Sequence, residues 1–563
     1  MLRFSDIECP RPSEQTLAER YAAINERLGV GTPEARQLAL ADWDSAKRDL
    51  ETWLALTEIR FHQDTSDEAA KANRAHGDAM KAAAQGHDVK LKRRLLADED
   101  RLGLTGLVGD HAVRLWETDV TAFDPAIADD VVCEAALVDS YTALTGSAKI
   151  EIDGKTVNLS GLAPYLQHPD RAMRHDAARL RWEFFERNGA ELDRIFDDLM
   201  ALRHGMATKL GYENFVGLAY KRMRRTDYGP QDVARYREQI LTEVVPLLAR
   251  IYEQRREQFG WDRLMAWDEP IVDPEGNPAP IGDAAELLTA ARGMFAALDE
   301  RLGAFGDMMA DGGFLDLETR ETKARGGFCT VLPTPGVPFV FANFTGTHGD
   351  ATVLTHEIGH AFQMWQSRNK PIIEYLWPTA EACEIHSMAL EFLAYPELDR
   401  LFGDVADRYR RLHMTYALNT FVMCAAIDHF QHMVYERPTA TAAERHTMWR
   451  DLERRYMPWR DYGDLAYPAK GGSWQWILHV YMVPFYFIDY ALAQCVAMQL
   501  WTKSQTDQVG TFDTYAKLCA SGGSAPFIEL VRDAGLVSPF ADGALSASVA
   551  AAERELKAAG LVR

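Results

Sequence analysis

Several features are scarce in this chain of 563 residues. It has seven cysteines and no CxxC pair, so it offers neither a disulfide framework nor a cysteine-based zinc site, and reduced thiols favour a cytoplasmic protein. Lys and Arg number 61 against 83 Asp and Glu, and the net charge of −22 argues against a nucleic-acid partner. Two short basic runs, 90–94 and 221–225, lie in charge-mixed surroundings and are interpreted as solvated helix faces.

Long apolar stretches are scarce as well. The N-terminus carries Arg3, Asp6 and Glu8 in place of an apolar core, so we expect no secretion signal. The longest uncharged stretch, residues 471–488, is interrupted by two glycines, His479 and a proline. We therefore expect a buried helix that lines a cleft, and no membrane partner.

Helical periodicity, in contrast, is abundant, with apolar residues recurring three and four positions apart from about residue 14 to 120 and again after 160. Helices are expected at about 168–189, 191–211, 229–258 and 283–302, with helices resuming from about 396 to 455. Residues 69–97 have few large apolar side chains and predict an exposed helical segment. The alternative there is a coiled coil, which no sustained heptad supports.

A few short segments alternate as strands do. In residues 149–159, alternating residues lie on both sides of Asp153-Gly154, and an Asp-Gly pair in this setting is a strong hairpin signal. Residues 325–330 and 338–344 read as two strands joined by a proline-rich turn. A free edge on the 338–344 strand could pair with an extended peptide, and the alternative is a plain structural hairpin.

The motif that organises the chain is His356-Glu357-Ile-Gly-His360. On a helix, His356 and His360 are one turn apart on one face, so two ring nitrogens can reach one metal ion. Glu357 is on the same turn, close enough to an attacking water to accept its proton. Imidazole and carboxylate ligands with one open position favour zinc, one ion per chain.

Two observations bear on the alternative that these are ordinary core histidines, in a chain with sixteen histidines. Gly359 costs a helix about 1 kcal/mol, so it needs another reason to be there. Glu384 follows His360 by 24 positions in a second predicted helix and is a candidate third ligand. Glu391, two turns further on, is a candidate to orient a liganding histidine.

The sequences HEIGHAFQ and EACEIHSMALEF resemble the thimet-oligopeptidase and oligoendopeptidase F family of zinc metallopeptidases, most closely its shorter bacterial Pz-peptidase-like members. The resemblance extends to residues 338–350, to the His479 segment and to the segment around Tyr486 and Tyr490, so it covers essentially the whole chain. Two residues depart from the pattern of many relatives, which have His where this chain has Gln363 and Tyr where it has Ile488.

The resemblance implies a mainly helical, zincin-like fold of the gluzincin type. Two helical lobes would enclose a deep catalytic cleft, with a small β-sheet beside the zinc helix. An N-terminal helical segment would cover residues 1–165, and the catalytic region would cover 166–563.

The resemblance also implies a zinc endopeptidase that hydrolyses short oligopeptides. His356, His360 and Glu384 would hold zinc, with water as the fourth ligand, and Glu357 would be the general base. His479, Tyr486 and Tyr490 would bind the transition state. From spacing alone, the aromatic residues of this segment could equally pack a core.

Two alternatives stay open at this point. One is a related zinc exopeptidase, either a carboxydipeptidase or an aminopeptidase, although the G-x-M-x-N segment usual in the aminopeptidase is absent before the zinc helix. The other is a helical peptide-binding protein with a vestigial site, against which the intact motif residues argue.

Overall fold

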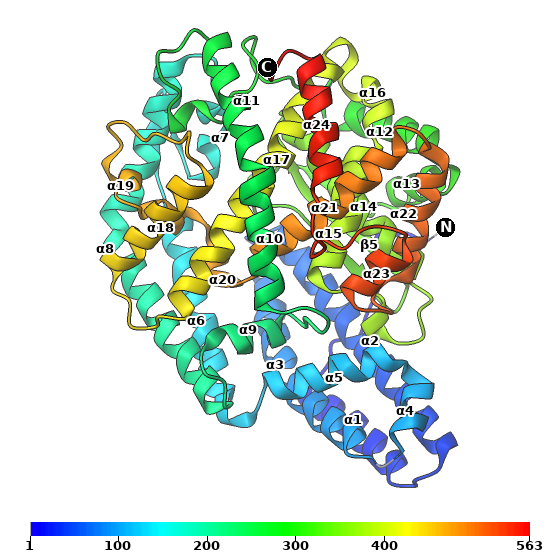
Figure 1. Ribbon diagram of the computed structural model, residues 1–563. Coiled ribbons are helices and arrows are strands. Elements are labelled where there is room, and N and C mark those ends of the chain that lie inside the picture. Colours follow the sequence, from blue (N-terminus) through cyan, green and yellow to red (C-terminus); the bar gives the residue numbers. More distant parts are fainter. Residues whose placement is uncertain (1, 99) are drawn as a thin grey trace. The chain divides into compact units, whose positions relative to one another are not determined.

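The computed structural model describes residues 2–98 and 100–563 (Figure 1). The predicted mainly helical class is confirmed, with a two-stranded and a three-stranded sheet. The chain forms two compact units, each built from three separate stretches. Unit 1 comprises Met1–Thr121, Ala279–Ala406 and Val496–Leu536, and unit 2 comprises Ala122–Pro278, Asp407–Cys495 and Val537–Arg563. The sequence-based boundary near residue 165 stays a prediction.

Unit 1 contains the motif helix and the three-stranded sheet. Its elements are η1 (Phe4–Asp6), α1 (Glu14–Leu28), α2 (Pro33–Gln63), α3 (Glu68–Leu96), α4 (Arg101–Val108), α5 (Asp110–Ala122), α12 (Ala284–Leu298), α13 (Glu300–Asp311), β3 (Leu315–Glu318), β4 (Phe328–Leu332), β5 (Val337–Phe344), α14 (His348–Ser367), η5 (Ile373–Tyr375), α15 (Ala380–Leu393), η6 (Tyr395–Glu397), α16 (Asp399–Phe402), η7 (Gly403–Val405), α22 (Gln508–Ser521) and α23 (Phe527–Asp533).

Unit 2 contains the hairpin and the remaining helices. Its elements are η2 (Pro125–Ile127), α6 (Ala128–Gly146), β1 (Ile150–Ile152), β2 (Lys155–Val157), η3 (Ser160–Leu162), α7 (Ala163–Leu166), α8 (Arg171–Lys209), α9 (Phe215–Arg222), α10 (Pro230–Glu243), α11 (Val245–Gln258), η4 (Ala266–Asp268), α17 (Ala406–Tyr435), α18 (Ala442–Tyr456), α19 (Ala466–Ala469), η8 (Gly472–Trp476), α20 (Leu478–Met482) and α24 (Ser546–Ala558). The chain passes from unit 2 to unit 1 within α21 (Phe487–Ser504).

Three of the predicted helix boundaries are wrong. The helix expected at 283–302 is two helices, α12 and α13, which meet at Asp299. The helices expected on either side of residue 190 are one continuous helix, α8. Gly189 is buried within it, and a Cβ there would lie 2.9 Å from the Tyr467 hydroxyl, so this glycine provides close packing and does not end the helix. The single helix expected at 229–258 is two helices, which divide at Val244. The break occurs there because a proline is tolerated in the first turn of a helix but not in its interior, and Pro246 lies in the first turn of α11.

The predicted hairpin is confirmed, with β1 and β2 antiparallel around Asp153 and Gly154 at φ of 50° and 70°. The buried helix expected over 471–488 is wrong. That stretch is η8, then α20, then a break before α21, and Pro484 in the break cannot donate the backbone hydrogen bond that a helix needs. Among the described residues, no helix has the length and apolar character that a membrane crossing requires.

The three-stranded sheet has the order β3-β5-β4, with β5 parallel to β3 and antiparallel to β4. The two predicted strands are thus confirmed as β4 and β5, whereas β3 was not predicted. The expected free edge on the 338–344 strand is wrong, because β5 is central and pairs on both sides. Within the part of the chain that the structure describes, β4 has a strand partner on one side only.

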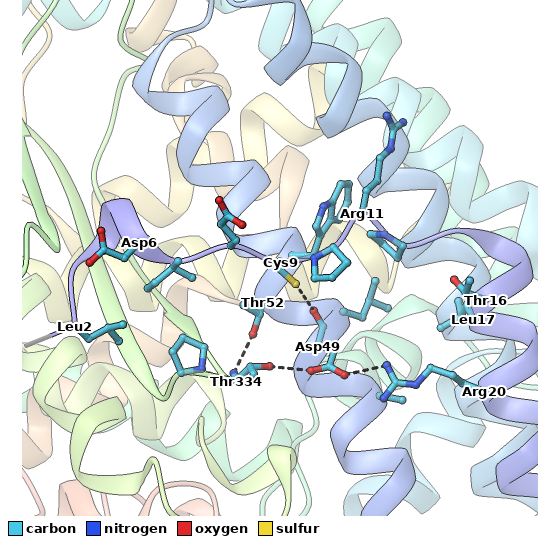
Figure 2. A pocket seen from close by; sticks show the side chains of 18 residues that line it. Leu2, Asp6, Cys9, Arg11, Thr16, Leu17, Arg20, Asp49, Thr52 and Thr334 are labelled. Carbon is cyan, nitrogen blue, oxygen red and sulfur yellow. Dashed lines mark hydrogen bonds and ion pairs between the residues drawn. The ribbon is translucent and has the colours of Figure 1, made fainter.

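The turn between β4 and β5 is anchored on α2. The Thr334 backbone N–H donates to Thr52 Oγ1 at 2.9 Å, and its hydroxyl lies 3.1 Å from Asp49 Oδ1. Asp49 also pairs with Arg20 at 3.0 Å, and its carbonyl accepts from the Cys9 thiol at 3.6 Å. Figure 2 shows these groups around a pocket of about 700 Å³ beneath the N-terminal segment. The turn between β4 and β5 is therefore held against α2.

Residues 69–97 form α3, which is less exposed than predicted, because Met80, Leu91 and Leu95 pack into a core shared with α1 and α2. Neither basic run is wholly a solvated face. Lys92 is buried and pairs with Asp88 and Asp119, and Arg225 is buried as well. The seven cysteines are all free thiols, as expected.

Candidate metal centre and active site

The HExxH helix, α14, begins directly after β5 in a turn fixed by Asp350. The carboxylate of Asp350 accepts hydrogen bonds from the backbone N–H groups of Thr345 at 3.0 Å and Gly346 at 2.6 Å. The helix then packs against β5, α15 and α22 (Figure 1). The motif therefore lies on a helix that is fixed at its start and covered on several sides.

The structure brings the three predicted metal ligands together. His356 Nε2 and His360 Nε2 lie 3.3 Å and 3.4 Å from the same carboxylate oxygen, Glu384 Oε2. One donor atom of each residue lies within 4.8 Å of the other two. Donor atoms about 2.1 Å from a tetrahedral zinc ion are about 3.4 Å apart, so this donor set fits zinc.

Neighbouring groups orient the two imidazoles. His356 Nδ1 lies 2.7 Å from Glu391 Oε1, the contact expected from the sequence, and a proton on Nδ1 leaves Nε2 free to ligate. His360 Nδ1 lies 3.7 Å from the buried Cys383 thiol. The Ser387 hydroxyl donates to Glu384 Oε2 at 3.0 Å. Each donor is thus held by a second contact.

Burial and charge act against each other at this centre. Burial alone would lower the pKa of His356, but its hydrogen bonds to Glu384 and Glu391 raise that pKa well above its usual value. Burial would likewise raise the pKa of Glu384, but the two imidazoles hold it well below its usual value. A proton therefore competes with a metal ion for this donor set, and metal affinity should fall as pH falls.

Glu357 differs from the other two carboxylates of the site. It is 8% exposed and, among residues 2–98 and 100–563, nothing forms a hydrogen bond or ion pair with it. A Cβ on Gly327, next to β4, would lie 3.8 Å from Glu357 Oε1. Burial raises the pKa of Glu357, which makes the carboxylate a better proton acceptor.

Gly359 allows α14 and α15 to approach closely. A Cβ at this position would lie 2.5 Å from the His386 carbonyl oxygen and 2.7 Å from Ser387 Cα, both backbone atoms of α15. The two helices carry the candidate metal ligands, so their separation sets the distance from the histidines to Glu384. This close approach explains a glycine that helix propensity does not.

We expect Gly359→Ala to displace α15, because the clash is with backbone atoms that cannot rotate away. It should lower the free energy of unfolding by about 2 kcal/mol and weaken metal binding. The control is Gly349→Ala in the same helix, where the nearest atom to a new Cβ is Thr347 Oγ1 at 3.4 Å. Thermal denaturation and metal titration of both variants measure the effect, and equal behaviour of the two contradicts this explanation.

The two departures from the family pattern are both buried. Gln363 donates to Ser367 Oγ and to the Leu376 carbonyl, each at 3.0 Å, and so holds α14 against the segment that follows it. Ile488 is fully buried in α21. His386 is buried beside Cys519, and burial lowers its pKa to about 3. His348, at the start of α14, is also buried.

The predicted transition-state residues His479, Tyr486 and Tyr490 form one aromatic cluster in unit 2. The rings of His479 and Tyr486 are nearly parallel, with their centroids 5.8 Å apart. The centroids of the Tyr486 and Tyr490 rings are 5.2 Å apart. All three side chains are partly exposed, unlike the core aromatic residues around them. Tyr486 directly precedes α21 and is not within it.

The residues that hold this cluster were not predicted. Phe485, just before Tyr486, has φ of 68°, a conformation that is costly for a bulky residue. Buried Arg225 donates to the Phe485 carbonyl at 2.6 Å and to Asp489 at 2.6 Å, and Gln431 accepts from the Phe485 N–H at 3.1 Å. Arg225 is in the basic run interpreted as solvated, and its pairing with a residue 264 positions away has no local signal.

Two histidines one turn apart on one helix, and a glutamate from a second helix beside them, are the arrangement of a gluzincin-type metallopeptidase. Comparison with known proteins defines the family. Residues 164–549 match the model of peptidase family M3, and residues 4–123 match the peptidase M3 N-terminal domain. The chain belongs to peptidase family M3 and is a metalloendopeptidase by that membership.

Solved structures agree over the full length. A chain provisionally named oligoendopeptidase F is 41% identical with a TM-score of 0.94, and 99% of each chain is covered. Pz peptidase A with an inhibitor is 38% identical with a TM-score of 0.95, again over 99% of each chain. A provisionally named oligoendopeptidase F from Bacillus anthracis is 36% identical with a TM-score of 0.90, covering 99% of this chain and 98% of that one. A comparison with curated proteins found no match.

Proposed function

We propose that the protein is a zinc-dependent endopeptidase of short oligopeptides. The observation that carries this is the convergence of His356 and His360 on one oxygen of Glu384 at tetrahedral donor spacing. The similarity to structures named oligoendopeptidase F and Pz peptidase supports the substrate class.

A zinc ion held by His356, His360 and Glu384 would polarise the scissile carbonyl and acidify the attacking water. Glu357 takes a proton from that water and delivers it to the leaving amine, because its carboxylate has no other partner among the described residues. His479 and Tyr486 donate hydrogen bonds to the oxyanion of the tetrahedral intermediate, with Tyr490 beside them.

The strand that we propose for peptide pairing is β4. It is an edge of the sheet, and Gly327 at its start is adjacent to Glu357. An extended peptide hydrogen-bonded to β4 would pass the general base without any side chain intervening at that glycine. Pairing with backbone groups makes little use of sequence, which suits a peptidase that accepts varied peptides.

The test is hydrolysis of a quenched fluorescent peptide with and without 1,10-phenanthroline. We expect cleavage that the chelator abolishes and that added zinc restores. An endopeptidase should still cleave the same peptide when it is N-acetylated and C-amidated. Loss of cleavage on blocking either end would indicate an exopeptidase, and absence of cleavage with metal bound would indicate a vestigial peptide-binding site.

Tyr486→Phe should lower kcat roughly a hundredfold while KM changes little, because the phenol donor acts on the transition state only. The hydrogen bonds of Arg225 and Gln431 with the Phe485 backbone should keep that backbone in place in this variant. Steady-state kinetics at saturating zinc provide the measurement. A change confined to KM or to stability would return Tyr486 to a packing role.

Substrate length should be limited. An extended peptide spans about 3.3 Å per residue and loses only its own conformational entropy, whereas a folded protein must first unfold locally to pair with β4. We expect oligopeptides of roughly five to twenty residues to be cleaved and long unfolded chains to be cleaved poorly. Peptides with one cleavable core and growing flanks, ending with an unfolded protein, measure this. If kcat/KM is the same for the decapeptide and for the unfolded protein, the enzyme is not an oligopeptidase.

A further inference from the structure

A small cavity of about 220 Å³ lies in unit 2, next to the segment that carries His479. Its walls include Arg181 of α8 and Trp476, the last residue of η8. His479 follows Trp476 by three positions, and three residues of extended chain span at most about 11 Å. The Trp476 wall of the cavity is therefore at most about 11 Å along the backbone from His479.

Arg181 is held between two indole rings in this cavity. Its guanidinium carbon lies 4.8 Å from the Trp182 ring centroid and 5.2 Å from that of Trp476. Trp182 is buried, whereas Trp476 is 38% exposed. Stacking on aromatic faces restricts the rotation of a guanidinium group and so fixes the direction of its N–H donors.

Among the described residues, Arg181 forms no ion pair. Within residues 2–98 and 100–563, no carboxylate pairs with Arg181 and no oxygen accepts a hydrogen bond from it, and its Nε is buried without a partner. Burial lowers the pKa of Arg181 to about 10, so it is still charged near neutral pH. A partly buried, oriented cation without an ion-pair partner favours an anionic ligand.

The carboxylates that line the same cavity are engaged elsewhere. Arg460 donates to both oxygens of Glu269, at 2.8 Å and 2.6 Å. Glu453 accepts from the Tyr462 hydroxyl at 2.6 Å and the Ser473 hydroxyl at 2.9 Å. A ligand carboxylate at Arg181 would therefore not displace an internal ion pair.

We propose that Arg181, oriented by Trp182 and Trp476, is a subsite for a carboxylate of the peptide substrate. The inference rests on the proposed function, because the anions of an unmodified peptide are carboxylates. Either a C-terminal carboxylate or an Asp or Glu side chain supplies this chemistry, and the fork of a guanidinium group matches both. The site would select acidic or C-terminally free peptides even though the protein carries a net charge of −22.

The test uses matched quenched peptides on the zinc-loaded, full-length enzyme. One series compares a free C-terminus with its amide, and another compares Glu with Gln at each of the three positions on either side of the cleaved bond. We expect the wild-type enzyme to prefer the carboxylate at one position by roughly tenfold or more in kcat/KM, mainly through KM. The series in which the preference occurs identifies the source of the carboxylate.

In Arg181→Met the ratio of kcat/KM between the carboxylate peptide and its neutral counterpart should fall to about one. The kcat/KM of the neutral peptides should change by less than roughly twofold. Arg187→Met, a control at an exposed arginine six positions along α8, should keep the preference. Trp476→Leu removes only the partly exposed indole, and it should raise KM for the carboxylate peptides several-fold even if Arg181→Met folds poorly.

The outcomes separate the two proposals. A wild-type enzyme that cleaves peptides without any carboxylate preference overturns the subsite alone. So does an Arg181→Met variant that retains the preference or loses carboxylate and neutral substrates equally. An enzyme that cleaves no peptide at all overturns the proposed function, and the subsite with it.

Discussion

Glu357→Gln should lose turnover by roughly a thousandfold or more while it retains its zinc. The amide keeps the shape of the side chain but cannot accept a proton, so the loss should appear in kcat and leave KM little changed. Glu357 makes no hydrogen bond or ion pair with the rest of the described chain, so the substitution breaks no internal contact. Kinetics and metal analysis of the same preparation measure both quantities.

Glu384→Ala should have the opposite effect and lose zinc. The substitution removes the oxygen on which both histidine Nε2 atoms converge and leaves two protein ligands, one fewer than the three that hold a catalytic zinc ion. We expect well below one zinc per chain after dialysis, with activity lost as a consequence.

The graded control for metal loss is Glu391→Gln, which weakens the contact to His356 Nδ1. It should lower zinc affinity by roughly ten- to a hundredfold without abolishing binding. If Glu357→Gln lost zinc while Glu384→Ala kept it, the roles assigned to the two glutamates would be reversed.

The local part of the candidate site could be predicted from sequence because its spacing follows from helix geometry. His356, Glu357 and His360 occupy one helix, and Glu384 and Glu391 lie two turns apart on the next, so five residues needed only the periodicity of two helices. Arg225, Gln431 and Arg181 could not be found this way. Their contacts join residues far apart in the chain, and an arginine in a basic run has the same local sequence whether it is buried or solvated.

The fold was predictable to a similar degree. Helix content follows from apolar periodicity, but boundaries depend on contacts that sequence does not show, as when Gly189 packs against Tyr467 inside a continuous helix. The strand β3 was missed because four residues give little alternation to detect. That omission also placed the free edge of the sheet on the wrong strand, since the position of β5 depends on both of its neighbours.

The division of unit 1 among three stretches of chain affects how the protein is made. The helix α22 covers α14, where the Phe362 ring lies 6.1 Å from that of Tyr515, yet α22 begins 115 residues after α15 ends (508 − 393). At about 5 to 20 residues per second, a ribosome takes roughly 6 to 23 s to synthesise that interval. Both metal-binding helices therefore wait for a late segment before their core can close. We therefore expect metal binding at a late stage of biosynthesis, after most of the polypeptide has left the ribosome.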